Sequence, residues 1–116
     1  MSLLTYTDTE IHKLAEPIWI NIIDGSNQIN YKLFSASFSE DLKKKVTEER
    51  FHSQCKEFPL LTSLTKDVTF IGCIRRESGT TILWKQKSSK LAGEFLGQVT
   101  LQEKNGDISV IEVSVY

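Results

Sequence analysis

The fold is decided by residues 11–23, IHKLAEPIWINII, in which apolar side chains recur at steps of three and four. This spacing places one apolar stripe along a helix, so the stretch predicts a helix that packs against a core. A capping-box pattern, TDTE, precedes it at residues 7–10, and Gly25 follows it as a left-handed stop. We therefore expect a helix over residues 8–24 with a kink at Pro17, because proline removes one backbone hydrogen bond.

The next part of the chain, residues 26–59, predicts several short helices. Ser39 and Thr47 each precede a run of acidic residues and are suitable N-caps. After Thr47 the apolar residues again recur at steps of four and three, which places them on one helix face. Pro59 ends this helix.

From Asp67 onward the apolar period changes to two, which is typical of strands. Alternating apolar and polar residues predict four strands in succession, and Gly72 within the first of them indicates a bulge or a close approach. Short turns between the strands favour an antiparallel sheet. The order of helices first and strands afterwards predicts an α+β fold, with the N-terminal helices packed on one face of a four-stranded sheet.

The last two strands are joined by Asn105-Gly106, the strongest short hairpin pattern in the sequence. A two-residue turn of type I′ pairs Leu101 with Val110. Along the last strand the apolar set changes phase by one residue at Ile111. A β-bulge near Val110 and Ile111 produces such a change, so we expect a bend there.

Composition limits the classes of partner. The 116 residues fit one domain, residues 1–116, and the 40% of hydrophobic and 25% of charged residues are ordinary for a globular protein. Lys and Arg number 14 and Asp and Glu 15, for a net charge of −1, which gives no electrostatic reason to expect a nucleic acid. No apolar run reaches transmembrane length, so we expect no membrane insertion.

The two cysteines, Cys55 and Cys73, have no CxxC spacing and no clustered histidines, which argues against a metal site. We expect two separate buried thiols and no cofactor. Residues 1–8 lack the charged-then-apolar order of a signal peptide, which predicts a cytoplasmic location. The location is periplasmic instead if an export signal precedes the sequence given, and a Cys55–Cys73 disulfide would favour that alternative of an exported accessory domain.

The order of motifs resembles a known fold. A long helix is followed by NYKLF at 30–34, FSEDL at 38–42, a helix entered at TEERF at 47–51, a strand with ILWK at 82–85 and a hairpin at 105–106. This order resembles the cystatin-like cone fold of the nuclear transport factor two-like superfamily, in particular its small bacterial branches of unassigned function. The resemblance implies a curved sheet wrapped round the first helix, a pocket inside the cone and, often, a homodimer. Isomerases, dehydratases, ligand binders and transport adaptors share this fold, so it does not decide the function.

Aromatic residues on the expected inner face, together with Tyr31 at the pocket mouth, are the candidates for lining a ligand pocket. These candidates are Trp19, Tyr31, Phe70, Trp84 and Phe95. None of the inner-face positions that we assign is ionisable, whereas acid–base enzymes need such a group inside the pocket. Tyr31 is the best polar candidate, because its hydroxyl can orient a ligand at the pocket mouth.

Apolar residues on the expected outer face of the sheet are the candidates for an interface. These candidates are Ile71, Leu83, Ile111, Val113 and Val115, with Cys73 beside them. A large exposed apolar patch usually marks an interface, so they favour a homodimer. Together with the pocket, this predicts a non-enzymatic binding or interaction module that can hold a small apolar ligand.

The alternative prediction is a small-molecule isomerase or lyase that uses Tyr31 with His52 or Asp24. His12 follows the first apolar helix position and is expected on the surface, as are His52 and Asp24. No serine–histidine–aspartate order, phosphate-binding loop or carboxylate pair is present as a motif, so we assign no catalytic residue and no metal ligand.

Overall fold

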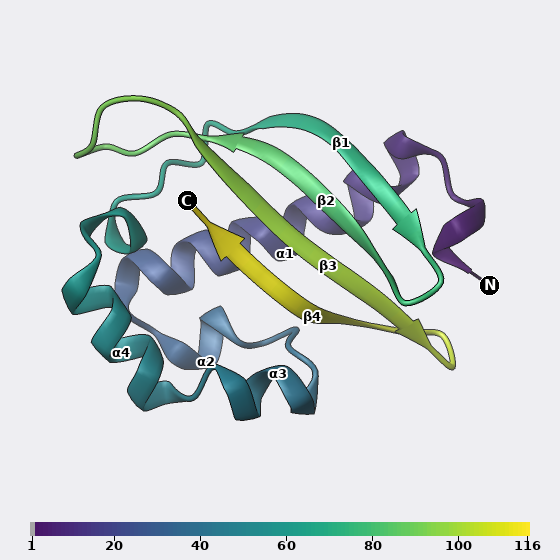
Figure 1. The fold of residues 1–116 in the computed structure, drawn as a ribbon, viewed down its shortest axis with the longest axis horizontal. Helices are drawn as coiled ribbons and strands as arrows, with labels where there is room; N and C mark the ends of the chain where they lie inside the picture. The colour runs from purple at the N-terminus through teal and green to yellow at the C-terminus, as the bar shows by residue number, and fades with distance from the viewer. Residues whose placement is uncertain (1) are drawn as a thin grey trace.

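Helices occupy the first half of the chain and strands the second in the structure, a computed structural model that describes residues 2–116 (Figure 1). The helical elements are η1 (Leu3–Thr5), α1 (Asp8–Gln28), α2 (Tyr31–Phe34), α3 (Glu40–Lys45), α4 (Glu48–Glu57) and η2 (Pro59–Thr62). The strands are β1 (Thr69–Arg76), β2 (Gly79–Gln86), β3 (Phe95–Lys104) and β4 (Asp107–Val115), antiparallel in the order β1-β2-β3-β4. The expected α+β class with a curved, open sheet is confirmed.

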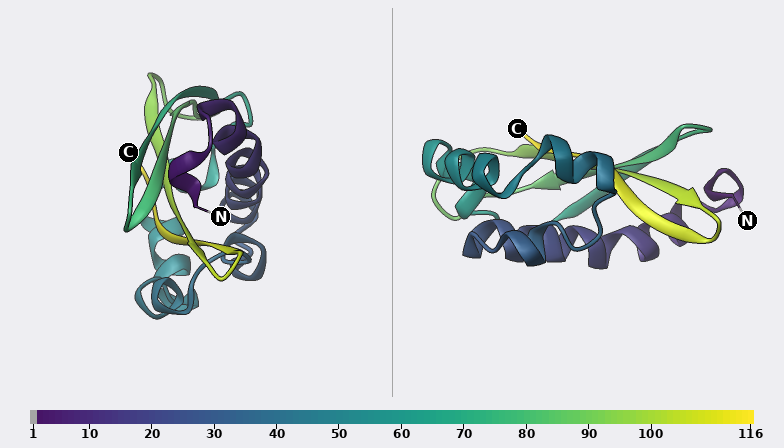
Figure 2. Two further views of the ribbon diagram at one scale, coloured as in Figure 1. Left: turned by 90° about the vertical axis from the view of Figure 1, so that its right-hand side faces the viewer. Right: turned by 90° about the horizontal axis from the view of Figure 1, so that it is seen from below.

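Two layers result from this order. Helix α1 lies across one face of the sheet, whereas α3 and α4 lie beside the edge formed by β4 (Figure 2). The start of α1 has the expected capping box: the Glu10 N–H donates to the Thr7 hydroxyl over 3.1 Å, and the Thr7 N–H donates to the Glu10 carboxylate over 2.9 Å. The helix continues through Pro17 in one element.

Helix α1 is longer than expected, because Gly25 does not stop it. The helix runs on to Gln28 and ends at Ile29, which has a left-handed φ of 52°. A side chain at Gly25 would place its Cβ 2.3 Å from the Phe34 backbone nitrogen. Gly25 is therefore needed for the close approach of α2 to α1 and not for a turn, and the expected end at residue 24 is wrong.

The hairpin and both bulges follow the sequence. Asn105 and Gly106 have φ values of 53° and 85°, as a type I′ turn requires, and Lys104 pairs with Asp107. The register of β3 and β4 then shifts between Thr100 and Leu101, which leaves Ile111 as the extra residue of the predicted bulge. A second shift in β1 lies between Phe70 and Gly72, so of the two alternatives expected for Gly72, a bulge or a close approach, the structure shows a bulge.

The core is organised by one aromatic contact between the two layers. The indole of Trp19 on α1 stacks on that of Trp84 on β2, with ring centroids 5.2 Å apart and an interplanar angle of 13°. The Trp19 Nε1–H donates to the side-chain oxygen of Gln86 over 3.1 Å, so its one polar atom is paired although the residue is buried. Gly97 of β3 leaves room for the ring, since a Cβ there would lie 2.5 Å from Trp19 Cζ2.

The bulge at Ile111 corrects part of the expected outer face. Beyond it, Val113 pairs with the fully buried Val99, and Val115 pairs with Gly97, under Trp19. Val113 and Val115 therefore pack against the core on the α1 side. The expectation that both face outward is wrong, because the extra residue returns the strand to its original phase.

Residue Cys73 also faces inward, where it joins a polar cluster that ties β1 to the start of α1. It pairs with the buried Ile82, and its thiol donates to the Asp8 carboxylate over 3.3 Å. The Arg75 guanidinium donates to the same carboxylate and to the Tyr6 carbonyl oxygen, the latter over 3.0 Å. The hydrogen bond from Arg75 is the main reason that the pKa of Asp8 lies below its ordinary value of 3.8.

Substitution of Gly97 tests the contact with Trp19. We expect Gly97→Ala to lower the free energy of unfolding by about 2 kcal/mol, because the added methyl group overpacks a rigid ring. The matched control is Gly72→Ala, whose Cβ would meet nothing within 4 Å, and for which we expect a change below about 0.5 kcal/mol. Urea denaturation of both variants measures the difference, and equal effects would contradict the packing described.

Substitution of Asp8 gives a pH dependence with a definite sign. Because the pKa of Asp8 is lower in the folded protein, its pairing stabilises the fold above the ordinary value of 3.8 and is lost as the pH falls through the folded value. We expect Asp8→Asn to lower the thermal midpoint at neutral pH and to flatten its decline in acid. Asp67→Asn, at an exposed position, is the control. Identical pH profiles for Asp8→Asn and the unaltered protein would contradict the role of this carboxylate.

Candidate functional site

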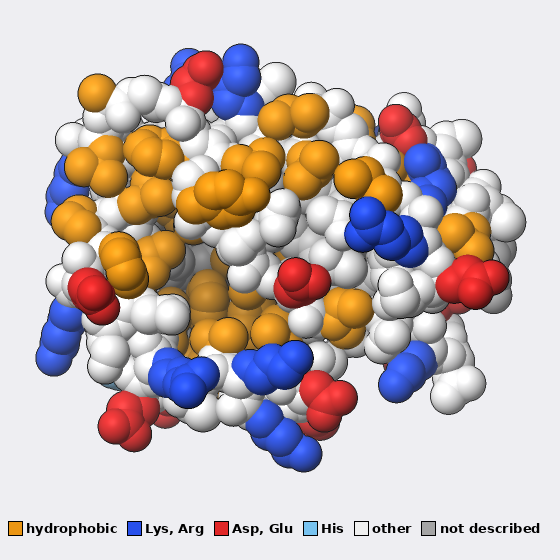
Figure 3. Space-filling view, in the orientation of Figure 1, with side chains coloured by type: hydrophobic (Ala, Val, Ile, Leu, Met, Phe, Trp, Pro, Cys, Tyr) orange, Lys and Arg blue, Asp and Glu red, His pale blue; other side chains and the backbone are white. Residues whose placement is uncertain are grey.

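The larger of the two hollows described here is an apolar cavity of about 460 Å³ between α1, β4 and the helices beside the sheet edge. It opens on the face seen in Figure 3, where hydrophobic side chains lie inside a depression beside the end of β4. Trp19 and Ile22 of α1 contribute to its lining, and Val113 and Val115 of β4 form one side. The other side comes from residues in or between α2, α4 and η2, among them Phe34, Val46, Phe51, Phe58 and Leu61.

Stacked aromatic rings hold the helical side of the cavity together. The rings of Phe34 and Phe51 stack with centroids 4.2 Å apart, and Phe38 meets Phe34 edge-on at 5.0 Å. The Tyr31 hydroxyl donates to the Val46 carbonyl oxygen over 2.6 Å, which fixes α2 to the junction of α3 and α4. These contacts give the short helices a defined position although none is long enough to be stable alone.

Two polar side chains near the end of α1 attach the segment around η2. The buried Ser26 hydroxyl donates to the Leu61 carbonyl oxygen. The Asn27 side chain forms a reciprocal pair with Leu64, donating to its carbonyl oxygen over 2.7 Å and accepting from its N–H over 2.9 Å. Because most of the lining is apolar and the Ser26 hydroxyl is already hydrogen-bonded, the cavity favours an apolar ligand group, although the buried Ser114 hydroxyl has no partner within residues 2–116.

The five predicted pocket residues separate into different parts of the molecule. Trp19 lines the cavity, and Trp84 lies behind it in the core, fully buried. Tyr31 supports the helical side through its hydroxyl. Phe70 stacks on the His12 ring at the other end of α1, with centroids 4.4 Å apart, and Phe95 lies at the start of β3, opposite Gln86.

Sequence reasoning missed the helical side of the cavity. Phe34, Phe58 and Leu61 line it, yet none was among the candidates. The steps of four and three from Phe51 to Phe58 already indicated one apolar face on α4, which was the available signal. What the sequence did not reveal is that α4 lies beside the sheet edge, so that this face closes a cavity.

The residues of the enzymatic alternative do not meet in a cavity. Asp24 pairs with Lys66 over 2.9 Å, and His52 pairs with Glu48 over 3.9 Å on the exposed side of α4. Neither they nor Tyr31 lines either of the two cavities described here. The geometry therefore lends no support to acid–base catalysis by these three groups.

One histidine differs from expectation. His12 is half-buried and not on the open surface, because Phe70 of β1 covers one side of its ring. Its Nε2 lies 3.0 Å from the Glu16 carboxylate on the next turn of α1. This arrangement positions the start of α1 against β1 and leaves His12 outside both cavities.

Both thiols are free in the structure and are unreactive in character. Burial raises the pKa of the Cys55 thiol, and burial together with the Asp8 carboxylate raises that of Cys73. Since the thiolate is the nucleophile, neither cysteine is activated at neutral pH. The two thiols lie on different elements, α4 and β1, and each has its own polar neighbour, Ser26 and Asp8 respectively.

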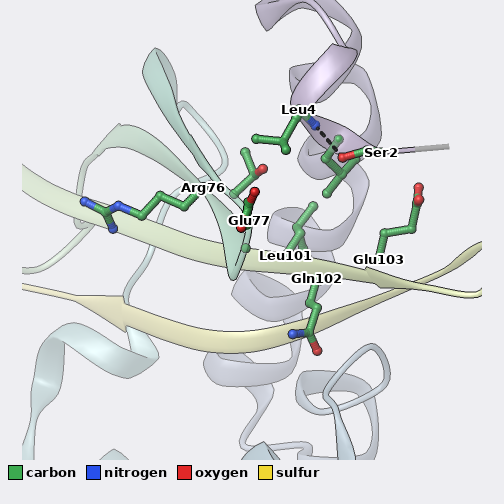
Figure 4. A pocket seen from close by; sticks show the side chains of 10 residues that line it. Ser2, Leu4, Arg76, Glu77, Leu101, Gln102 and Glu103 are labelled. Atoms are coloured by element: carbon green, nitrogen blue, oxygen red, sulfur yellow. Dashed lines mark hydrogen bonds between the residues drawn. The ribbon is translucent and has the colours of Figure 1, made fainter.

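A second, smaller cavity of about 140 Å³ lies where η1 meets the turn between β1 and β2 (Figure 4). Leu3 and Leu4 of η1, the turn residue Glu77 and Leu101 of β3 are among its lining residues. Arg76 extends away from the other side chains in Figure 4, so the polar groups do not converge on one point. We interpret this cavity as the space left where η1 covers the end of the sheet.

The outer face of the sheet carries a smaller apolar patch than expected. Ile71 and Ile74 of β1 are 55% and 45% exposed, and Leu83 and Ile111 are partly exposed. Figure 3 shows hydrophobic side chains gathered over β1, β2 and β3 on this face. With Cys73, Val113 and Val115 on the inner face, the patch is centred on the first two strands.

Comparisons with known proteins give no functional assignment, so any assignment rests on the geometry described above. Among residues 2–116 the structure brings together no three acidic, histidine or cysteine side chains that could hold a metal ion, and no helix in this part of the chain has the length and apolar character needed to span a membrane. The sequence matches no family model, and comparisons with curated proteins and with solved structures found no similar chain.

Proposed function

We propose that this chain is a non-enzymatic binding module whose apolar cavity receives an apolar group of its ligand. The observation that carries the proposal is the cavity itself: about 460 Å³, open to solvent, with Trp19, Phe34 and Phe51 among its lining residues. Pockets of this volume and apolar character are typical of ligand sites in proteins. No aspartate, glutamate, histidine, lysine or arginine is among the described residues that line this cavity, which favours binding there over acid–base catalysis.

We also propose that the domain is a cone-fold member of the nuclear transport factor two-like superfamily. A long first helix held against a curved four-stranded antiparallel sheet supports this, as does a cavity bounded by that helix and the sheet. Members of this superfamily are often homodimers. The exposed Ile71 and Ile74 on the outer face support a dimer in which that face pairs two copies.

Binding of an apolar dye tests the cavity. We expect Nile red to bind the unaltered protein with a rise in fluorescence, and Gln54→Trp to weaken that binding by about tenfold, because Gln54 is a lining residue and the larger ring fills part of the space. The matched control is Ser53→Trp, at an exposed neighbour outside the lining. Equal loss in both variants, or no binding by the unaltered protein, would refute the cavity as a ligand site.

Analytical ultracentrifugation tests the dimer. We expect the unaltered protein to be a dimer at a concentration on the order of tens of micromolar. We expect Ile74→Lys to be a monomer, because the lysine charge would be desolvated in the interface. Asn21→Lys, at an exposed position on α1, is the control and should remain dimeric. A monomeric unaltered protein at that concentration would rule out the proposed pairing.

A further inference from the structure

The edge of β4 is half covered by the chain itself. At Val110, the N–H donates to the Ser37 carbonyl oxygen over 2.7 Å and the carbonyl oxygen accepts from the Ser39 N–H over 2.9 Å. Phe38 thereby forms a parallel bridge with Val110. The first half of this edge is thus already used for strand pairing, by a short segment between α2 and α3.

Beyond Val110 the same edge is open. Tyr116 and Leu96 exchange both backbone hydrogen bonds, at 2.8 and 3.1 Å, and Ser114 stands opposite Gln98 in the same register. In an antiparallel ladder the pairs alternate, so the N–H and C=O groups of Val113 and Val115 point away from β3. Within residues 2–116 these groups have no protein partner.

The open edge and the apolar cavity form one groove. Residues 113–115 of β4 and Tyr116 after it all line the cavity, and the side chains of Val113 and Val115 pack on its α1 side. In Figure 3 the depression lies beside the end of β4, and the short helices lie on its other side. A strand added to this edge would therefore place every second side chain in the cavity.

The rim of the groove has the chemistry of a protein interface. Phe58 and Tyr116 both line it and are 50% and 67% exposed, and large aromatic rings of this kind are typical anchors at interfaces. On the side of the groove opposite β4, helix α3 ends in three lysines that directly precede Val46, a lining residue. Figure 3 shows basic side chains over α3 at this border, and Lys44 and Lys45 have no acidic partner in the described part of the chain.

We propose that this groove binds an extended peptide segment with alternating apolar side chains and acidic ends, which adds to β4 as a fifth strand. The backbone groups of Val113 and Val115 supply the strand pairing, the cavity takes the inward side chains, and the lysines of α3 attract the acidic ends. The pairing continues the one that residues 37–39 already make at Val110. This inference rests on the proposed function and specifies the class of ligand.

The test uses a defined probe, the capped heptapeptide Glu-Leu-Thr-Leu-Thr-Leu-Glu, and fluorescence anisotropy with the unaltered protein. One derivative carries N-methyl groups on the three leucine amides and another on the two threonine amides. In an added strand only one of these two sets of N–H groups faces β4. We expect methylation of that set to weaken binding at least about tenfold and methylation of the other set to leave it nearly unchanged.

The outcomes separate the two proposals. Failure of the peptide to bind, or equal tolerance of both methylated sets, overturns strand addition. Nile red binding without peptide binding overturns this inference and leaves the proposed function standing, with a small molecule as the ligand. Failure of both probes overturns both.

A charge variant tests the acidic ends. We expect Lys45→Glu to weaken peptide binding by about threefold at low ionic strength, and to lose this effect in high salt, because the attraction is between exposed charges. The control is Lys13→Glu, at an exposed position on α1 outside the cavity lining. Equal affinities of the two variants would contradict the role of the α3 lysines.

Discussion

The stack of Trp19 on Trp84, with Gly97 beneath it, is the constraint on which the rest of the structure depends. It joins α1 to the middle of the sheet, and both rings are buried. Because two large rings fill this position, α1 cannot approach the sheet more closely or rotate without exposing them. The Nε1–H of Trp19 donates a hydrogen bond to Gln86, which fixes the orientation of the indole ring and how deeply the ring lies in the core.

The cavity follows from where the short helices can go once this contact is made. Because Gly25 has no side chain, α2 can contact α1 directly, and the stack of Phe34 on Phe51 then holds α4 next to α2. These helices then lie beside the β4 edge, as Figure 2 shows, and not over the sheet. The space between them and Val113 and Val115 stays unfilled, which leaves an apolar cavity and an unpaired edge next to each other.

Local sequence patterns predicted the helices, strands and turns well, whereas they did not predict contacts between residues far apart in the sequence. The capping box at Thr7, the hairpin at Asn105 and the bulge at Ile111 each depend on neighbouring residues, and all three are confirmed. Gly25 was misinterpreted because its reason is a contact with Phe34. Of the site, the sequence indicated Trp19 but not the residues opposite it, because nothing local tells on which side of a sheet a short helix will lie.

The central claim is that Trp19 stacks on Trp84 and lies over Gly97, and it is tested most directly by nuclear Overhauser contacts in solution. We predict strong cross-peaks from the Trp19 indole ring protons to the Gly97 α protons and to the Trp84 ring, because Cζ2 of Trp19 lies next to Gly97. A Trp19 indole with cross-peaks to its own helix alone, and solvent exchange of its Nε1 proton as fast as in an unfolded chain, would contradict the account.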